Sequence, residues 1–204
     1  FPAYVHRGNE MMRLMALLSP TLTTARLVLR PFRDADRREV FELHSNARVM
    51  RYWDSAPWRD ETQADRFLAR CRALSDNEAG ARVAVERRDT GRFIGWIGLQ
   101  HWDHDNRSAN LGYVFAEHAW GQGYATEAGR ALLEWGFDVM DLNRVSAQTD
   151  TRNEASARVL TKLGFTLEGI LRENVIVDGE VSDDATYSLL RREWTSTHSA
   201  PSPQ

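Results

Sequence analysis

The chain has 204 residues, of which 42% are hydrophobic and 27% charged, and its formal net charge is −3. This globular composition excludes a disordered chain and offers no basic excess of the kind that nucleic-acid binding needs. No apolar run reaches the roughly 18 residues of a membrane span, and a lone cysteine, Cys71, fits a reducing compartment. We therefore expect a cytoplasmic protein that binds neither membranes nor nucleic acid directly.

The chain is predicted to hold one domain. We find no internal repeat and no linker between residues 21 and 194, which we assign to that domain. Residues 1–20 are predicted to be an N-terminal extension, and their apolar run Met11–Leu18 makes a poor signal peptide because no convincing cleavage site follows it. Residues 195–204 are rich in Ser and Pro and are predicted to be a disordered tail.

The first half of the domain is predicted to contain a strand, two helices and three more strands. Pro31 ends the first strand, and Asp34 stands where the first helix would take its N-terminal cap. Later strands follow from alternating apolar residues and from the turn Asp89-Thr90-Gly91. The predicted ranges are strand 27–29, helices 34–44 and 62–74, strands 81–86, 93–99 and 111–115, and a polar loop at 103–107.

A long helix is predicted to begin near Tyr124, because apolar residues recur there at steps of three and four. The residues expected on its buried face are Ala125, Ala128, Leu132, Trp135 and Val139. After it come strand 144–149, helix 153–163 ended by a left-handed Gly164, a strand opening at 165–167, the hairpin turn Asp178-Gly179 and strand 185–190. This order predicts a mixed sheet with helices on both faces.

The segment most informative about function joins strand 111–115 to the long helix. It contains Trp120-Gly121-Gln122-Gly123, and glycines let backbone amides approach a ligand closely. A helix N-terminus adds free N–H groups and a partial positive charge, so the segment predicts a phosphate or pyrophosphate site. A plain strand-to-helix turn explains the two glycines equally well.

Two other phosphate-binding motifs disagree with this segment in detail. A P-loop needs Gly-Lys followed by Ser or Thr, but Gly123 is followed by Tyr124-Ala125. A dinucleotide-binding fingerprint wants Gly or Ala at position 126, which is Thr126, and it belongs to an early βαβ unit. The segment lies past the middle of the chain instead.

Four blocks of sequence together point to one family. They are Thr24–Pro31, Trp120–Ala128, Asn153–Ser156 with Leu160–Phe165 and Glu168-Gly169, and the closing Asp178-Gly179, Asp183 and Tyr187–Leu190. In this order they resemble the GNAT superfamily of N-acetyltransferases, within the branch of the ribosomal-protein N-terminal (RimJ/RimL-like) enzymes. The general superfamily has Gln or Arg where this chain has Trp120, but Trp is common in this branch.

The resemblance implies an α/β GNAT fold whose mixed, mostly antiparallel central sheet is splayed at the cofactor site. It implies transfer of an acetyl group from acetyl-CoA, the cosubstrate, directly to an amine bound in the same complex. The expected acceptor is a protein N-terminal α-amino group. A small-molecule amine such as an antibiotic or a polyamine stays open, as does a non-catalytic acyl-CoA-binding module. A homodimer is expected from this branch, although no residue pattern in the chain indicates one.

The resemblance also implies which residues hold the cofactor. The backbone of Val114 and Phe115 would pair with the pantetheine arm. The pyrophosphate would bind the backbone amides of Gln122, Gly123, Tyr124, Ala125 and Thr126. Asn153, Ser156 and Lys162 would contact the cofactor too, although Asn153 also suits a helix cap and Lys162 a solvated helix face.

The catalytic residues expected from the resemblance are an acid and a base. Ser156 is the candidate acid that protonates the leaving CoA thiolate, with a helix-terminus hydrogen bond as its structural alternative. Glu173 is the first candidate for the general base and Asp183 the second, while the glutamate that some members carry two residues later is Val175 here. For each of these two carboxylates, the structural alternative is an ion pair with a nearby arginine.

Other residues that invite a chemical role are interpreted structurally. The stretch His101–Asp105 looks like a loop, so we expect no metal. Cys71 is far in sequence from every block and is predicted to be a small buried residue rather than a nucleophile. Trp53 and Trp58 belong either to the core or to the acceptor site.

Overall fold

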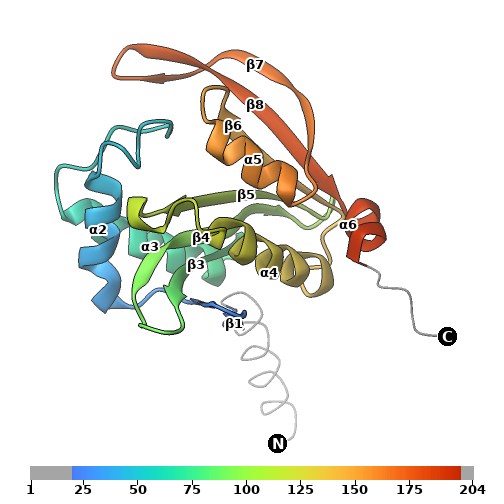
Figure 1. The fold of residues 1–204 in the computed structure, drawn as a ribbon, viewed down its shortest axis with the longest axis horizontal. Coiled ribbons are helices and arrows are strands. Elements are labelled where there is room, and N and C mark those ends of the chain that lie inside the picture. Colours follow the sequence, from blue (N-terminus) through green and yellow to red (C-terminus); the bar gives the residue numbers. More distant parts are fainter. Residues whose placement is uncertain (1–19, 199–204) are drawn as a thin grey trace, which may run out of the picture.

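The computed structural model describes residues 20–198, so the predicted N-terminal extension lies outside the described residues except for Pro20. Eight strands form one sheet in the order β1-β2-β3-β4-β5-β6-β8-β7 (Figure 1). They are β1 (Leu22–Thr23), β2 (Leu27–Arg30), β3 (Gly80–Arg87), β4 (Phe93–Asp103), β5 (Ser108–Phe115), β6 (Arg144–Asp150), β7 (Thr166–Val177) and β8 (Glu180–Leu190).

Five α-helices accompany this sheet within the described part of the chain. They are α2 (Arg37–Ser45), α3 (Thr62–Asp76), α4 (Tyr124–Asp138), α5 (Glu154–Lys162) and α6 (Arg191–His198), with short 3-10 turns η1 (Asp34–Asp36) and η2 (Glu117–Ala119). None of these helices is long and apolar enough to cross a bilayer.

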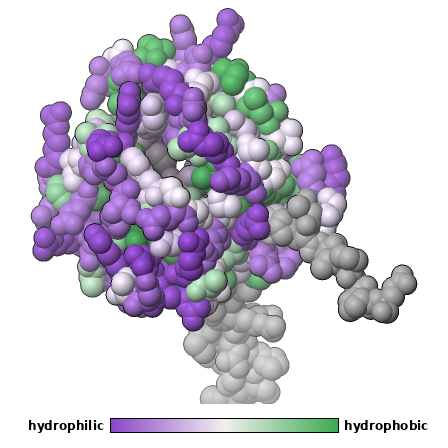
Figure 2. All heavy atoms as spheres, viewed as in Figure 1, coloured by the Kyte–Doolittle hydropathy of each residue, from purple (hydrophilic) through white to green (hydrophobic). Residues whose placement is uncertain are grey.

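The sheet parts in its middle, between β5 and β6. All other neighbouring strands pair antiparallel, whereas β5 and β6 run parallel and pair only over Ser108–Asn110 and Arg144–Ser146. Beyond Asn110 the two strands diverge (Figure 1), and the space-filling view is hollowed near its centre at this place (Figure 2). The predicted mixed, mostly antiparallel and splayed sheet is confirmed.

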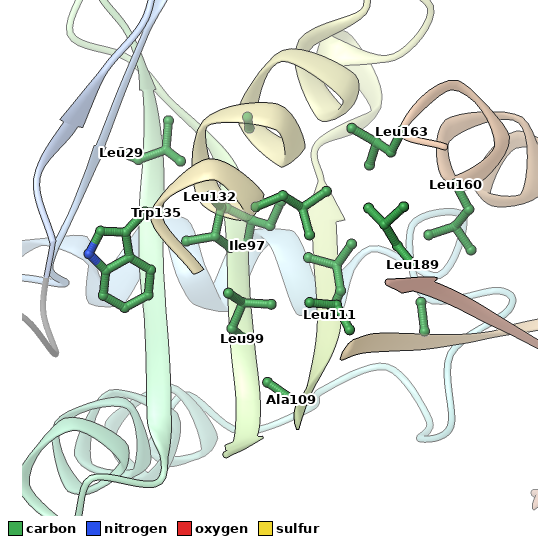
Figure 3. Packing of buried hydrophobic residues seen from close by; sticks show 14 of the residues in the cluster. Leu29, Ile97, Leu99, Ala109, Leu111, Leu132, Trp135, Leu160, Leu163 and Leu189 are labelled. Atoms are coloured by element: carbon green, nitrogen blue, oxygen red, sulfur yellow. The ribbon is translucent and has the colours of Figure 1, made fainter. Parts of the chain in front are cut away.

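Helices cover both faces of the sheet, as the element order predicts. On one face α4 and α5 pack over the strands, and Figure 3 shows Leu132 of α4, Leu160 of α5 and Leu111 of β5 in the same core. On the other face α2 and α3 enclose a second cluster that includes Trp96 and Val114. The period of two along each strand creates these two cores, because successive side chains point to opposite faces.

Two local predictions about the helices are wrong. Val139 is not on the buried face of α4 but is 42% exposed, because α4 ends at Asp138 and Met140 enters the core instead. Asp34 does not cap the first helix, since a 3-10 turn precedes α2. Asp36 holds the N-cap position of α2 without a side-chain cap bond, and its buried carboxylate accepts the N–H of Arg33 at 2.7 Å, which closes the 3-10 turn.

The predicted disordered tail is also partly wrong. Residues 195–198 continue α6, while residues 199–204 lie outside the described residues. The helix is held to the domain by Trp194, which is buried and stacks on Phe137 with ring centroids 5.6 Å apart. The Ser196 hydroxyl donates to the carbonyl of Glu193 at 2.8 Å, so a polar residue that suggests disorder is bonded within the helix.

His44 is a buried histidine in the second cluster and is fully hydrogen-bonded in its neutral form. Its Nδ1 lies 2.8 Å from the carbonyl of Val40, and its Nε2 accepts the indole N–H of Trp96 at 3.1 Å. A proton on Nε2 would face another N–H donor. Burial lowers the pKa of His44 from 6.5 to about 4.

This histidine predicts a loss of stability in mild acid. Between pH 6.5 and about pH 4 the unfolded chain binds a proton at His44 that the folded protein does not, so the free energy of unfolding falls as pH falls. We expect a loss of up to about 3 kcal/mol across this window. Urea unfolding at a series of pH values measures it, and His44→Gln should flatten the dependence. An equal slope in both proteins would contradict the prediction.

Candidate active site

The loop from β5 to α4 is fixed by hydrogen bonds within the loop itself. The indole N–H of Trp120 donates to the carbonyl of Phe115 at 2.7 Å, and the side-chain amide of Gln122 donates to the carbonyl of His118 at 2.8 Å. Gly123 has a φ of 79°, in the left-handed region that glycine adopts most readily. The chain therefore turns sharply at Gly123 and enters α4 directly.

The first turn of α4 offers an anion-binding surface. The first three N–H groups of a helix have no intrahelical partner, and here they belong to Tyr124, Ala125 and Thr126. Glu127 is the first residue whose N–H reaches back, to the carbonyl of Gly123 at 3.0 Å. No described side chain caps this helix end. The positive end of the helix dipole and these amides therefore suit a phosphate or pyrophosphate group.

Arg26 holds this loop from outside, and sequence reasoning missed it. Its guanidinium donates to the carbonyl of Gln122 at 3.0 Å and to the Glu127 carboxylate at 2.7 Å, and it lies 4.6 Å from the ring centre of Tyr124. Thr24 donates to the same carboxylate at 2.6 Å. Burial opposes ionisation of Glu127, but these hydrogen bonds outweigh it and lower the pKa. The one sequence signal for this contact was that Arg26 and Glu127 both lie in blocks that resemble the family.

The half of β5 beyond Asn110 presents an open backbone edge. The N–H of Ala116 donates to the carbonyl of Ile94 on β4 at 2.9 Å. Because directions alternate along an antiparallel ladder, the backbone groups of Val114 also point to β4, whereas those of Tyr113 and Phe115 point to the split. Of the two residues expected to pair with the cofactor, Phe115 thus lies on the open edge. The Val114 side chain packs in the second cluster.

Asn153 and Ser156 lie at the start of α5, beside the same split. Asn153 is the predicted N-cap: its side-chain oxygen accepts the N–H of Ser156 at 3.1 Å. The Ser156 hydroxyl is not used in the cap and instead lies 2.8 Å from the phenol oxygen of Tyr113. Lys162 is exposed at the other end of α5, roughly 9 Å along the helix axis. It lines an open cavity of about 440 Å³ with Thr151, Glu154, Ala157, Arg158 and Thr161.

Glu173 and Asp183 face each other across the β7–β8 hairpin. The pairing register shifts between Leu171 and Val175, so Glu173 lies in a bulge with a φ of 53°. The carboxylate of Asp183 accepts the backbone N–H of Glu173 at 2.8 Å, while the Asp183 carbonyl accepts the N–H of Thr151 at 2.9 Å. Asp183 therefore ties the exposed Glu173 bulge to the loop that leads into α5.

Cys71 and the stretch His101–Asp105 lie away from this split. Cys71 is buried on α3, and burial raises the pKa of its thiol to about 11, so it stays protonated. His101 belongs to β4, which runs further than predicted, and His104 stacks on Trp102 with ring centroids 4.0 Å apart. Among residues 20–198 no three His, Cys, Asp or Glu side chains gather as metal ligands would.

Trp53 and Trp58 pack on the second cluster while staying half-exposed. Trp58 stacks on His44 with ring centroids 4.1 Å apart, and Trp53 meets Trp96 edge-on at 5.8 Å. They come from the loop between α2 and α3, and their cluster includes Val114 of β5. The structure thus gives both tryptophans core contacts on the face of the sheet opposite α4 and α5.

These features define a class of protein. A sheet that parts between two parallel strands, an uncapped helix N-terminus beside the parting and a free strand edge leading into it suit an extended ligand that carries a pyrophosphate. This is the geometry of an acyltransferase that uses a coenzyme A thioester.

Comparison with known proteins identifies the family. Residues 26–166 match the model of the acetyltransferase (GNAT) domain, which is more than half of the chain. The chain is 36% identical over 172 residues to YoaA, an uncharacterized N-acetyltransferase of Bacillus subtilis, covering 84% of this chain and 97% of YoaA. The chain belongs to the GNAT family of acetyltransferases and is an N-acetyltransferase.

Solved structures share the fold at lower identity. Spermidine N-acetyltransferase from Vibrio cholerae, in complex with CoA and spermine, superposes with a TM-score of 0.75 at 22% identity, covering 84% of this chain and 99% of that one. RimJ of Mycobacterium smegmatis, in complex with CoA-disulfide, superposes with a TM-score of 0.75 at 24% identity, covering 82% and 83%. At these identities the two comparisons support the fold alone.

Proposed function

We propose that this N-acetyltransferase takes acetyl-CoA as its donor and transfers the acetyl group directly to a protein N-terminal α-amino group. The observation that carries the proposal is the uncapped N-terminus of α4, which stands beside the split between β5 and β6. A pyrophosphate fits the amides of Gln122 to Thr126, because helix N-termini bind anions without basic side chains. The pantetheine arm fits the open edge at Phe115 and Tyr113, as a strand would.

The same strand edge offers backbone N–H groups that could stabilise the transition state of acetyl transfer. When the amine attacks the thioester carbon, negative charge develops on the carbonyl oxygen, and an N–H held in place stabilises it. The carbonyl of Phe115 already accepts the Trp120 indole, so the backbone of this residue is held in one orientation. Asn153, Ser156 and Lys162 extend the proposed cofactor site along α5.

Proton transfer is assigned to two residues of the second half of the site, and a third positions one of them. Glu173 would take the proton from the acceptor ammonium, directly or through water. Ser156 would donate a proton to the leaving CoA thiolate. Asp183, the second candidate base, accepts the Glu173 N–H, so we assign it to positioning. Direct transfer follows because the only described thiol, Cys71, is buried and protonated.

A polyamine is the second candidate acceptor. One structural neighbour is a spermidine N-acetyltransferase, and the β7–β8 hairpin carries three neighbouring carboxylates, Glu173, Asp183 and Asp184. Carboxylates attract a polycation, and two of these three are engaged in the bulge: Asp184 accepts the side-chain amide of Asn174 at 2.9 Å. A peptide N-terminus carries one positive charge and needs fewer such groups.

The donor is tested by ligand-dependent stability. At about 100 times its dissociation constant a ligand stabilises by roughly 2.7 kcal/mol, which raises the melting temperature of a domain this size by about 5–10 °C. We expect this rise with acetyl-CoA and with CoA, but not with ATP or NAD. No rise with either CoA species would overturn the proposed donor site.

The acceptor is tested by CoA release during turnover. A peptide with a free N-terminal serine, the same peptide with a blocked N-terminus, and spermidine are compared at equal concentrations. Release with the free peptide alone supports the protein acceptor. Release with spermidine alone overturns it in favour of the polyamine, and binding without release from any amine would contradict a catalytic role for the split.

We also propose a homodimer as the assembly. Exposed apolar residues gather on the β7–β8 hairpin, and they are Leu167, Ile170, Leu171, Ile176 and Val181. A long edge strand with exposed apolar side chains supports pairing with a second copy. Light scattering on the full chain would give a dimer mass, and a monomer mass at high concentration would exclude this assembly.

A further inference from the structure

Tyr113 links the two sides of the split sheet. It lies on β5 beyond Asn110, where β6 no longer pairs, and its phenol oxygen is 2.8 Å from the Ser156 hydroxyl at the start of α5. Tyr113 and Ser156 are both half-buried. This hydrogen bond therefore crosses the cleft to which the thioester is assigned.

At this helix end the Ser156 hydroxyl has one well-placed partner among the described residues, which is the Tyr113 phenol. Its N–H donates to Asn153, which fixes the backbone. Its hydroxyl and the Tyr113 phenol each have a single proton, so one of them donates to the other. The alternative acceptor for the phenol, the Ser156 carbonyl, lies at 3.4 Å and is the weaker one.

We propose that Tyr113 is a positioning residue that donates its phenol hydrogen to Ser156, so that the serine proton is directed at the sulfur of the leaving CoA thiolate. This inference rests on the proposed function and assigns a role to a residue outside the expected set. If Ser156 donated to Tyr113 instead, its only proton would be held by the phenol oxygen and would not be directed at the sulfur.

The chemistry of the leaving group explains why a serine needs such a partner. When the C–S bond breaks, its electron pair stays on sulfur, and the thiolate takes the Ser156 proton while Tyr113 passes its own proton to the serine oxygen. An aliphatic hydroxyl is about as weak an acid as water. Burial raises the pKa of Tyr113 to about 12, so the phenol is still the stronger acid of the pair. The phenolate then regains a proton from solvent.

Tyr113→Phe tests the inference because it removes one oxygen and keeps the ring. We expect kcat for acetyl transfer to the serine peptide or to spermidine to fall about tenfold, since a supporting group of an acid contributes less than the acid itself. The KM for acetyl-CoA and the melting temperature should stay close to those of the wild type. Ser156→Ala combined with Tyr113→Phe should be no slower than Ser156→Ala alone, because the two groups act as a unit.

A matched control separates this role from general packing. Tyr187 is a buried tyrosine of β8 in the same core, and Tyr187→Phe should leave kcat unchanged. A wild-type enzyme that turns over while Tyr113→Phe keeps full kcat would overturn the inference alone. Additive losses in the double variant would also overturn it. A wild-type chain that binds acetyl-CoA but acetylates neither amine would overturn the proposed function, and this inference would fall with it.

Discussion

Gly95→Ala should destabilise the protein by about 3 kcal/mol or more, because backbone clashes are among the few causes of so large a loss. Gly95 has a φ of 150°, and an added Cβ would lie 2.2 Å from the carbonyl oxygen of Val114 and 2.8 Å from the Cα of Phe115. Both are backbone atoms of β5, so no side-chain rotation can relieve the contact. Relief requires that β4 and β5 move apart.

The effect should reach the active site as well as the fold. Gly95 pairs with Phe115, the residue whose backbone faces the split and whose carbonyl accepts Trp120. Urea unfolding measures the stability, and the acetyl-CoA-dependent rise in melting temperature reports the site. We expect that acetyl-CoA raises the melting temperature of any folded Gly95→Ala protein by less than it raises that of the wild type.

Gly169→Ala is the matched control for this experiment. Gly169 is also in a strand, on β7, but apart from its own two chain neighbours no residue has an atom within 4 Å of its added Cβ. Its unfolding free energy should change by less than about 1 kcal/mol, as for most unconstrained positions. Equal losses in the two variants would mean that the tight approach of β4 to β5 is not the cause.

The features that could be predicted from the sequence are those that depend on residues close together in the chain. The helical period from Tyr124, the glycines before it and the Asn153 cap depend on residues within a few positions of each other, and the structure confirms all three. The four family blocks then predicted a mixed, mostly antiparallel sheet that is splayed at the cofactor site, whereas the strand order and the parallel β5–β6 pair come from the structure. The prediction that Val139 lies on the buried face was wrong because the apolar period continues one residue past the end of the helix.

Contacts between distant residues lay beyond that reasoning. The Arg26–Glu127 pair joins residues 101 positions apart, and the Tyr113–Ser156 bond joins residues 43 apart. A local pattern cannot show such a pair, because the sheet and helix packing bring the partners together. The bulge at Glu173 is similar, since it depends on Asp183 across the hairpin. The residues that shape the site are thus placed by tertiary structure.

Glu173→Gln should lower kcat about 100-fold, the lower end of what a positioned general base contributes. The change removes the charge and the basic oxygen while it keeps the size of the side chain. Asp183 should behave differently, because its carboxylate accepts the Glu173 N–H rather than facing the acceptor alone. Asparagine retains an oxygen that accepts an N–H, whereas alanine does not. Asp183→Asn should therefore keep most of the activity and Asp183→Ala should lose it.

Steady-state rates with acetyl-CoA and the productive amine, measured for all three variants, distinguish the two carboxylates. If Asp183 were the base, Asp183→Asn would be as inactive as Asp183→Ala, and Glu173→Gln would remain active. If Glu173 is the base, raising the pH should partly restore the rate of Glu173→Gln, because a growing fraction of the amine is then already deprotonated in solution. Asp183→Ala should then recover no activity with pH, because its defect is the lost hydrogen bond that fixes the bulge. The two defects thus differ in pH dependence as well as in size, which makes the assignment testable without a bound structure.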